Sequence, residues 1–178
     1  MTPTPEPDEM RTDRLLLRRV GPGDVGAAIA VLADPETNRH NPAGPPSAAQ
    51  AAKMLAEWQA HWAHDGIGYW AVELPETGEV IGFGGLRHHE LDGERTLNLF
   101  YRFRPRHWGH GYAPEMARAA LEWAGRGRPT WPVTIITDPD NTPSQRVAEK
   151  LGFAHVGDSR TPVGPVLVWR RQEATMAS

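Results

Sequence analysis

Cysteine is absent from this 178-residue sequence, and its absence excludes disulfides, thiolate nucleophiles and cysteine-based zinc sites together. The sequence also has no apolar run close to the roughly 18–20 residues that a membrane-spanning helix needs. The first ten residues hold proline, threonine and acidic residues in place of a basic segment and an apolar core, so no secretory signal is expected. These absences predict a cytoplasmic protein with no membrane partner.

A large excess of charge of either sign is also missing. The formal net charge is −3 at pH 7, which gives no support for a nucleic-acid partner. The charge is nevertheless uneven, because Arg102, Arg104, Arg106 and His107 stand close together in one short segment. Such a local basic patch suits a multiply phosphorylated small molecule better than a nucleic-acid duplex.

Length and composition are those of one ordinary globular domain. Hydrophobic residues make up 39% and charged residues 23% of the chain, and a chain of 178 residues is long enough to bury a proper core. We expect a single domain over residues 11–173. Residues 1–10 and 174–178 are expected to be flexible tails.

Residues 97–124 carry the most informative pattern. An apolar and aromatic run ends at Phe103, and a short basic turn follows with Arg106, Gly109 and Gly111 in the spacing R-x-x-G-x-G. Apolar residues then recur at helical intervals. Glycine lets the backbone approach a bulky anion, and the first N–H groups of a helix have no acceptor within it. Strand, glycine turn and helix N-terminus together predict a pyrophosphate cradle.

Two common phosphate-binding motifs do not fit this turn. A P-loop needs G-x-x-x-x-G-K-[ST], and the turn has no such lysine. A dinucleotide-binding turn needs G-x-G-x-x-G and an acidic residue about 20 positions later. Here Tyr112, Ala113 and Pro114 follow Gly111, and no acidic residue lies near Trp131. The turn therefore argues against a P-loop protein and against a dinucleotide-binding protein such as a dinucleotide-dependent oxidoreductase.

The rest of the chain divides into short periodic segments. Residues 47–50 have the spacing of a helix capping box and precede a helical stripe with Trp58 and Trp62, and a second capping box begins at Thr142. Residues 34–46 are rich in proline and asparagine and predict a loop. A short helix is expected after residues 21–24. Strands are expected at residues 15–20, 69–74, 80–86, 97–103, 133–137, 153–157 and 166–171.

The pattern R-x-x-G-x-G after a strand is shared by the GNAT superfamily of N-acetyltransferases, which this chain resembles over almost its whole length. The likeness also rests on the segments RTDRLLLR (residues 11–18), GYWAV (68–72), VIGFGGL (80–86), WGHGYA (108–113) and NTPSQRVAEKLGF (141–153). These segments resemble the branch that contains the ribosomal-protein N-terminal alanine and serine acetyltransferases.

The resemblance implies an α/β (α+β) fold. Its mixed, mostly antiparallel sheet would have about seven strands with helices on both faces, in the order β-α-α-β-β-β-α-β-α-β-β. In that family, the strand before the cradle and the strand after its helix splay apart.

The resemblance also implies acetyl-CoA as co-substrate and no metal. Backbone groups of Phe100, Tyr101, Arg102 and Phe103 would pair with the pantetheine arm like an extra strand. Asn141 would bond the pantetheine amides, Ser144 would lie close to the thiol, and Arg146 would also contact the cofactor. The pyrophosphate would be held by Arg106, His107, Trp108, Gly109, His110, Gly111, Tyr112 and Ala113.

The catalytic groups follow the family pattern only in part. Many relatives place a tyrosine acid where this chain has Ala148, so Ser144 is the expected substitute for the acid. Many also carry a glutamate where this chain has Asn98, which cannot accept a proton but could position a water molecule. Other candidates for the base are His88, His89, Glu73 and Glu90, and a water relay is a further alternative.

The implied reaction moves an acetyl group from the thioester to a primary amine by direct transfer in a ternary complex. The acceptor is a protein N-terminus or a small amine, and residues 34–46 with the helix after them would define it. The alternative is a catalytically silent acyl-CoA-binding or regulatory module, which the missing tyrosine and Asn98 make credible. A homodimer is an open option, since members of the family are often dimers.

Overall fold

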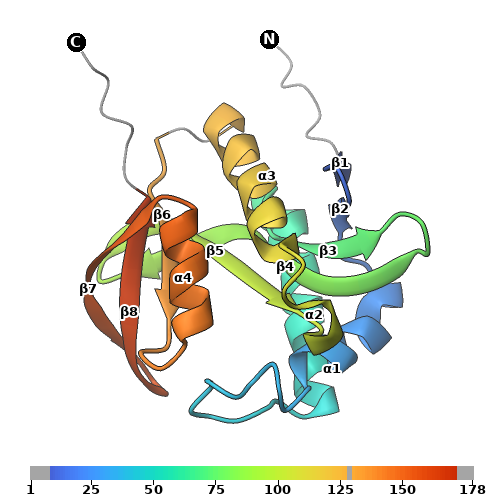
Figure 1. Ribbon diagram of the computed structural model, residues 1–178, viewed down its shortest axis with the longest axis horizontal. Coiled ribbons are helices and arrows are strands. Elements are labelled where there is room, and N and C mark those ends of the chain that lie inside the picture. The colour runs from blue at the N-terminus through green and yellow to red at the C-terminus, as the bar shows by residue number, and fades with distance from the viewer. Residues whose placement is uncertain (1–8, 128–129, 172–178) are drawn as a thin grey trace.

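The structure is a computed structural model that describes residues 9–127 and 130–171. It contains an eight-stranded sheet with the order β1-β2-β3-β4-β5-β6-β8-β7 (Figure 1). The neighbours β5 and β6 run parallel, and the other neighbouring strands run antiparallel. The strands are β1 (Glu9–Arg11), β2 (Leu16–Arg19), β3 (Tyr69–Leu74), β4 (Glu79–Leu91), β5 (Glu94–Phe103), β6 (Val133–Thr137), β7 (Phe153–Thr161) and β8 (Gly164–Arg171).

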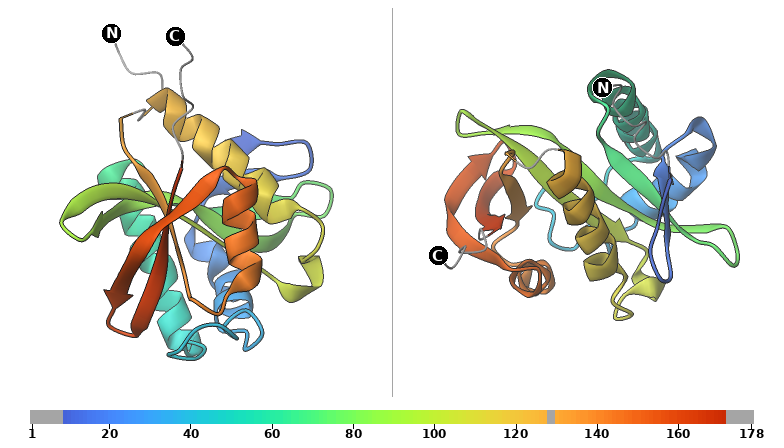
Figure 2. Two further views of the ribbon diagram at one scale, coloured as in Figure 1. Left: turned by 60° about the vertical axis from the view of Figure 1, so that its left-hand side comes forward. Right: turned by 90° about the horizontal axis from the view of Figure 1, so that it is seen from above.

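In the described residues, four α-helices lie on the two faces of this sheet (Figures 1 and 2). None of the helices in the described residues has the length and apolar character to cross a membrane. Short 3-10 turns precede α1 and α3 at Pro22–Asp24 and Pro105–His107. The helices are α1 (Val25–Leu32), α2 (Ala48–Asp65), α3 (Tyr112–Gly127) and α4 (Thr142–Lys150).

The predicted mixed, mostly antiparallel sheet with helices on both faces is confirmed, with one strand more than expected. The additional strand is β1, in which Met10 lies opposite Leu17 of β2. Glu9 and Met10 therefore belong to the sheet, although the sequence prediction assigned them to a tail. Residues 1–8 and 174–178 of the two predicted tails lie outside the described residues.

Local capping explains where two helices begin. Ser47 accepts from the N–H of Gln50, and the Gln50 side chain accepts from the N–H of Ser47, which confirms the predicted capping box of α2. At α4 the capping residue is Asn141, whose Oδ1 accepts from the N–H of Ser144 at 3.2 Å. The prediction that Thr142 caps α4 was therefore one residue late.

The apolar stripes of the helices build the core on both sides of the sheet. Trp58 and Trp62 of α2 are buried, as are Met116 and Trp123 of α3. The Trp70 ring of β3 meets the Trp123 ring edge-on with 5.6 Å between centroids. This packing fixes β4 and β5 between the two layers of helices, and those strands carry the features described next.

The neighbouring strands β5 and β6 diverge from about the middle of β5 (Figure 1). β5 pairs with β4 along its whole length, from Glu94 to Phe103. Its pairing with β6 is confined to Leu97 with Val133 and Asn98 with Thr134. Within the described residues, the second half of β5 therefore has no strand partner on the β6 side, which is the splay that the family resemblance implied.

Candidate active site

The unpaired edge of β5 offers backbone hydrogen-bonding groups. Leu97 donates its N–H to the carbonyl of Pro132, on the β6 side, at 2.8 Å, whereas Arg104 donates to Ile81 of β4 at 2.9 Å. Because alternate residues of a strand direct their peptide groups to the same side, the N–H and C=O of Tyr101 point into the splay. An extended amide-containing ligand can pair with this edge as an additional strand.

A glycine turn follows at the end of β5. Gly109 and Gly111 are exposed and adopt φ values of 77° and 79°, in the left-handed region that glycine enters without strain. Helix α3 begins directly afterwards, at Tyr112. In the described part of the chain, the N–H groups of residues 109–113 have no acceptor. The positive end of the α3 dipole lies behind these groups, so the anion cradle that the sequence predicts would consist of them.

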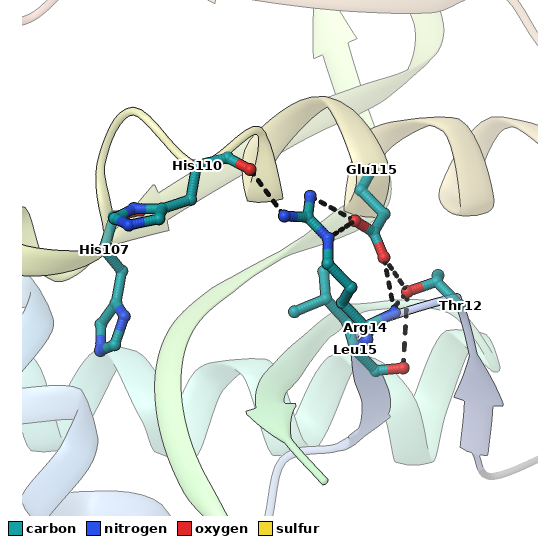
Figure 3. A network of polar contacts seen from close by, with 6 residues as sticks. All are labelled: Thr12, Arg14, Leu15, His107, His110 and Glu115. Atoms are coloured by element: carbon teal, nitrogen blue, oxygen red, sulfur yellow. Dashed lines mark hydrogen bonds and ion pairs between the residues drawn. The ribbon is translucent and has the colours of Figure 1, made fainter. Parts of the chain in front are cut away.

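A network that the sequence analysis missed holds this turn in place (Figure 3). The Arg14 guanidinium donates to the carbonyl oxygen of His110 at 2.8 Å and to the Glu115 carboxylate at 2.7 Å. Thr12 also donates to Glu115, at 2.6 Å. Partial burial alone would raise the pKa of Glu115, but the hydrogen bonds from Thr12 and Arg14 hold it below its usual value. The only sequence signal was the segment RTDRLLLR, and it does not reveal a contact with residues about a hundred positions away.

The basic residues around the turn are partly neutralised by Glu79. Arg106 forms an ion pair with Glu79, and Arg104 and His107 each lie 3.6 Å from the same carboxylate oxygen. Burial, together with the charges of Arg106 and Arg104, lowers the pKa of His107, which favours its neutral imidazole. Three residues of the predicted basic patch therefore gather around one carboxylate, where the Arg106 side chain is already engaged, whereas Arg102 bonds Asn38 instead.

Trp108 fastens the turn to the end of β5. Its indole N–H donates to the carbonyl of Phe103 at 2.9 Å, and the residue is 42% exposed. The Arg39 guanidinium, from the loop between α1 and α2, lies 5.7 Å from the centroid of that ring. The predicted loop at residues 34–46 thus reaches the cradle.

On the α4 side of β5, the structure brings Tyr101 and Ser144 together. Their hydroxyl oxygens are 2.8 Å apart, and the Tyr101 hydroxyl also donates to the Ser144 carbonyl at 3.2 Å. Burial raises the pKa of Tyr101 to about 12, so the phenol keeps its proton at neutral pH. The sequence analysis assigned Tyr101 a backbone role alone and therefore missed this hydroxyl pair.

Two other predicted cofactor residues lie on α4. Asn141 uses its side-chain oxygen to cap the helix, beside Ser144. Arg146 is exposed and has no hydrogen bond or ion pair within residues 9–127 and 130–171. Asn141 is thus placed near the splay, whereas nothing in the structure fixes the Arg146 side chain.

On the α2 side of β5, Asn98 and Phe100 join an aromatic cluster. Asn98 donates to the hydroxyl of Tyr69 at 3.0 Å, and the other end of its amide is buried without a hydrogen-bond partner among the described residues. Phe100 stacks on Tyr69 with 4.8 Å between ring centroids, and the centroid of the Trp58 ring lies 5.8 Å from that of Phe100. An unpaired polar end next to a phenol suits the positioning of an amine or a water molecule.

The two predicted catalytic residues, Asn98 and Ser144, therefore lie on opposite faces of β5. The remaining candidates for the base either form contacts with other residues or are set apart from Asn98 and Ser144. Glu73 pairs with Arg18 at 2.9 Å, and the His88 ring stacks on Trp131 with 4.6 Å between centroids. Burial lowers the pKa of His89, and Glu90 is exposed.

Comparisons with known proteins agree with this geometry. The chain matches the acetyltransferase (GNAT) domain model over residues 14–154. It is 30% identical over 166 residues to the protein YkkB of Bacillus subtilis (strain 168), which covers 90% of this chain and 94% of that protein. An acetyltransferase structure from Agrobacterium tumefaciens str. C58 is 29% identical, with a TM-score of 0.81 over 94% of this chain and 96% of that one.

A further solved structure shares the fold. It is the ribosomal-protein-S5-alanine acetyltransferase from Vibrio fischeri, with 14% identity and a TM-score of 0.69 over 96% of this chain and 99% of that one. Family model, splayed strands and glycine cradle lead to the same conclusion. The chain belongs to the GNAT family of acetyltransferases.

Proposed function

We propose that this acetyltransferase takes the acetyl group from acetyl-CoA and transfers it directly to a primary amine, either a protein N-terminus or a small amine, in a ternary complex. The observation that carries the proposal is the unpaired edge of β5, which runs into the open N–H groups of residues 109–113. A thioester with an amide-bearing arm and a diphosphate has the chemistry to match both parts at once.

The donor would lie along β5. The pantetheine amides would pair with the free peptide groups of Tyr101, and the diphosphate would take hydrogen bonds from residues 109–113. Asn141 has a side-chain amide near the same edge for a further bond to the pantetheine arm. We assign no specific contact to Arg146, since its side chain has no hydrogen bond or ion pair within the part of the chain that the structure describes.

The acceptor would approach from the α2 side. A free alkyl amine has a pKa near 10.4 and must lose a proton before its nitrogen can attack. Asn98 and the Tyr69 hydroxyl would hold the amine, or a water molecule that takes its proton. The new N–C bond forms as the C–S bond breaks, and the amine proton passes through water to solvent.

The leaving thiolate would be protonated from the α4 side. Ser144 would donate the proton, the Tyr101 hydroxyl, 2.8 Å away, would replace it, and the Tyr101 phenolate would then regain a proton from solvent. Because the pKa of Tyr101 is about 12, that proton is present throughout the neutral range. In this arrangement Ser144 acts as the general acid, because Ala148 stands where many relatives have a tyrosine and has no side chain that can donate a proton.

A catalytically silent acyl-CoA-binding module is the second candidate. Ala148 and Asn98 favour it, because neither side chain can itself donate or accept a proton in the reaction. Measuring thiol release from acetyl-CoA with a panel of amines and N-terminal peptides, alongside calorimetry with CoA, decides between the two. Thiol release with at least one amine supports transfer, whereas saturable CoA binding without release supports the silent module. No affinity for CoA contradicts both.

A further inference from the structure

Arg102 occupies a position on β5 that the donor site does not use. Its side chain lies on the α2 face, because residues 98, 100 and 102 alternate with those that face α4. The Arg102 guanidinium carbon is 5.6 Å from the centroid of the Phe100 ring. One guanidinium nitrogen donates to Oδ1 of Asn38 at 3.3 Å, which ties it to the loop between α1 and α2.

The charge of Arg102 has no counter-charge. Among residues 9–127 and 130–171, no carboxylate forms an ion pair with it. Burial lowers the pKa of its guanidinium, and no acidic neighbour offsets that effect. By contrast, Arg18 is bound by both Asp24 and Glu73. A half-buried cation with only one neutral oxygen as partner costs stability, which indicates a partner from outside the chain.

The neighbours of Arg102 identify the kind of partner. Phe100 stands between Arg102 and Asn98, and its ring stacks on Tyr69. In the proposed function, the acceptor amine is held near Asn98. A group bound by Arg102 would then belong to the same acceptor molecule and lie past the stacked rings of Phe100 and Tyr69. A guanidinium recognises a carboxylate by forked, charge-assisted hydrogen bonds. An acceptor with an amine and a nearby carboxylate would satisfy both ends.

Asn38 strengthens this placement. Its Nδ2 donates to the carbonyls of Leu32 and Asp34 at 2.7 Å and 2.8 Å, so its amide is held in place and presents its oxygen to Arg102. The loop therefore holds Arg102 from one side without neutralising it. The remaining donor groups of the guanidinium are left for a ligand.

We propose that Arg102 binds a carboxylate of the acceptor, so that the preferred acceptors carry a carboxylate close to the reacting amine. This inference rests on the proposed acetyl transfer and names its substrate class. The carboxylate belongs either to a free amino acid or to an acidic side chain at a peptide N-terminus. The two sources present the same chemistry to Arg102.

Paired acceptors test the proposal directly. Free amino acids are compared with their primary amides, and amidated peptides that begin with Asp or Glu are compared with those that begin with Asn or Gln. Two quantities are measured for each pair: kcat/KM for thiol release from acetyl-CoA, and Kd by calorimetry with CoA-loaded protein. We expect the carboxylate member of one series to be preferred about ten- to hundredfold. The series that shows the preference identifies the source.

Three variants locate the effect. R102Q is expected to abolish the preference, and R102K, which keeps the charge without the fork, to retain part of it. R87Q is the matched control, because Arg87 is a second arginine on the same sheet face, with its guanidinium 5.4 Å from the Tyr69 ring centroid. R87Q is expected to keep the preference. The melting temperature of R102Q should not fall, since the variant removes an uncompensated charge; a purely structural Arg102 would lower it.

Several results would overturn the assignment. Equal kcat/KM and equal Kd within every pair would do so, as would loss of the preference in R87Q but not in R102Q. Acetylation of amines without any carboxylate preference leaves the proposed function intact and rejects this inference. If no amine releases thiol, the proposed function fails, and the calorimetric comparison still decides whether Arg102 binds a carboxylate.

Discussion

The two faces of β5 differ in how they are built. On the α4 side, the strand contributes backbone groups and one hydroxyl pair, Tyr101 with Ser144. On the α2 side it contributes side chains: Asn98 and Phe100 meet aromatic residues of α2 and β3, and Arg102 meets the Phe100 ring and Asn38. In the proposed reaction the first face serves the donor and the second serves the acceptor.

This difference indicates which parts of the molecule can vary. A donor that is common to a family can be bound by peptide groups, which are present whatever the side chains are. An acceptor that differs among relatives needs particular side chains, and three elements with a loop supply them here. The donor face should therefore be the general part of this enzyme and the acceptor face its specific part.

The largest expected effect tests the donor face. Replacing Ser144 with Ala removes the proposed acid, and we expect kcat to fall about a hundredfold or more. Steady-state thiol release with the best acceptor measures it. Ser159→Ala is the matched control, because Ser159 of β7 bonds Asp92 of the β4–β5 turn and should retain wild-type turnover. Unchanged turnover in Ser144→Ala would remove Ser144 from the mechanism.

The next effect tests the cradle. Gly111→Ala places a Cβ at a φ of 79° and 3.5 Å from the Arg14 guanidinium. We expect CoA affinity to fall about tenfold, as strain of about 1–2 kcal/mol shifts the turn. Gly93→Ala is matched to it, with a φ of 82° in the β4–β5 hairpin. Both variants should lose similar stability, and Gly93→Ala should keep the calorimetric Kd for CoA. An equal Kd in both would show that the turn does not hold the diphosphate.

A third variant tests whether the donor face and the acceptor face of β5 act independently. Asn98→Ala should lower kcat about fivefold to tenfold, because one positioning hydrogen bond contributes about 1 kcal/mol. Since Asn98 faces away from Ser144, the Kd for CoA should stay at the wild-type value. Calorimetry and thiol release are measured on the same preparation. A weakened CoA complex with unchanged kcat would show that the division between the faces is wrong.

The smallest effect concerns the support of the cradle. Glu115→Gln weakens the contacts that the Glu115 carboxylate makes with Arg14 and Thr12. We expect the unfolding free energy to fall by about 1 kcal/mol, a small value because Arg14 is exposed and solvent screens its charge. The pKa of Glu115 is lowered in the folded protein, so this contribution is present above the usual value of 4.5 and disappears as the pH falls through the folded pKa.

Urea unfolding at several pH values measures this dependence. The wild-type protein and Glu115→Gln should differ at pH 7 and converge in the acid range. A difference that stays constant across that range would mean that the Glu115 charge does not support the turn.

Periodicity and capping patterns predicted most elements of the fold. The Ser47 capping box formed as expected, and the glycine turn precedes α3 as the spacing R-x-x-G-x-G required. These features depend on residues a few positions apart, so the sequence contains the information directly. The Thr142 cap was misplaced by one residue because Asn141 offers an equally suitable oxygen. β1 was missed because its pairing with β2 adds a short edge strand with little pattern of its own.

The sequence by itself determined the local structure of the proposed donor site, because strand, glycine turn and helix start follow one another along the chain. Only the tertiary structure decided which side chains meet across β5. The Tyr101–Ser144 pair joins residues 43 positions apart, and Arg14 reaches Glu115 across 101 positions. Such contacts arise from sheet register and helix packing, which place alternate residues of one strand on opposite faces. The pattern of a single sequence does not encode that register in any short segment.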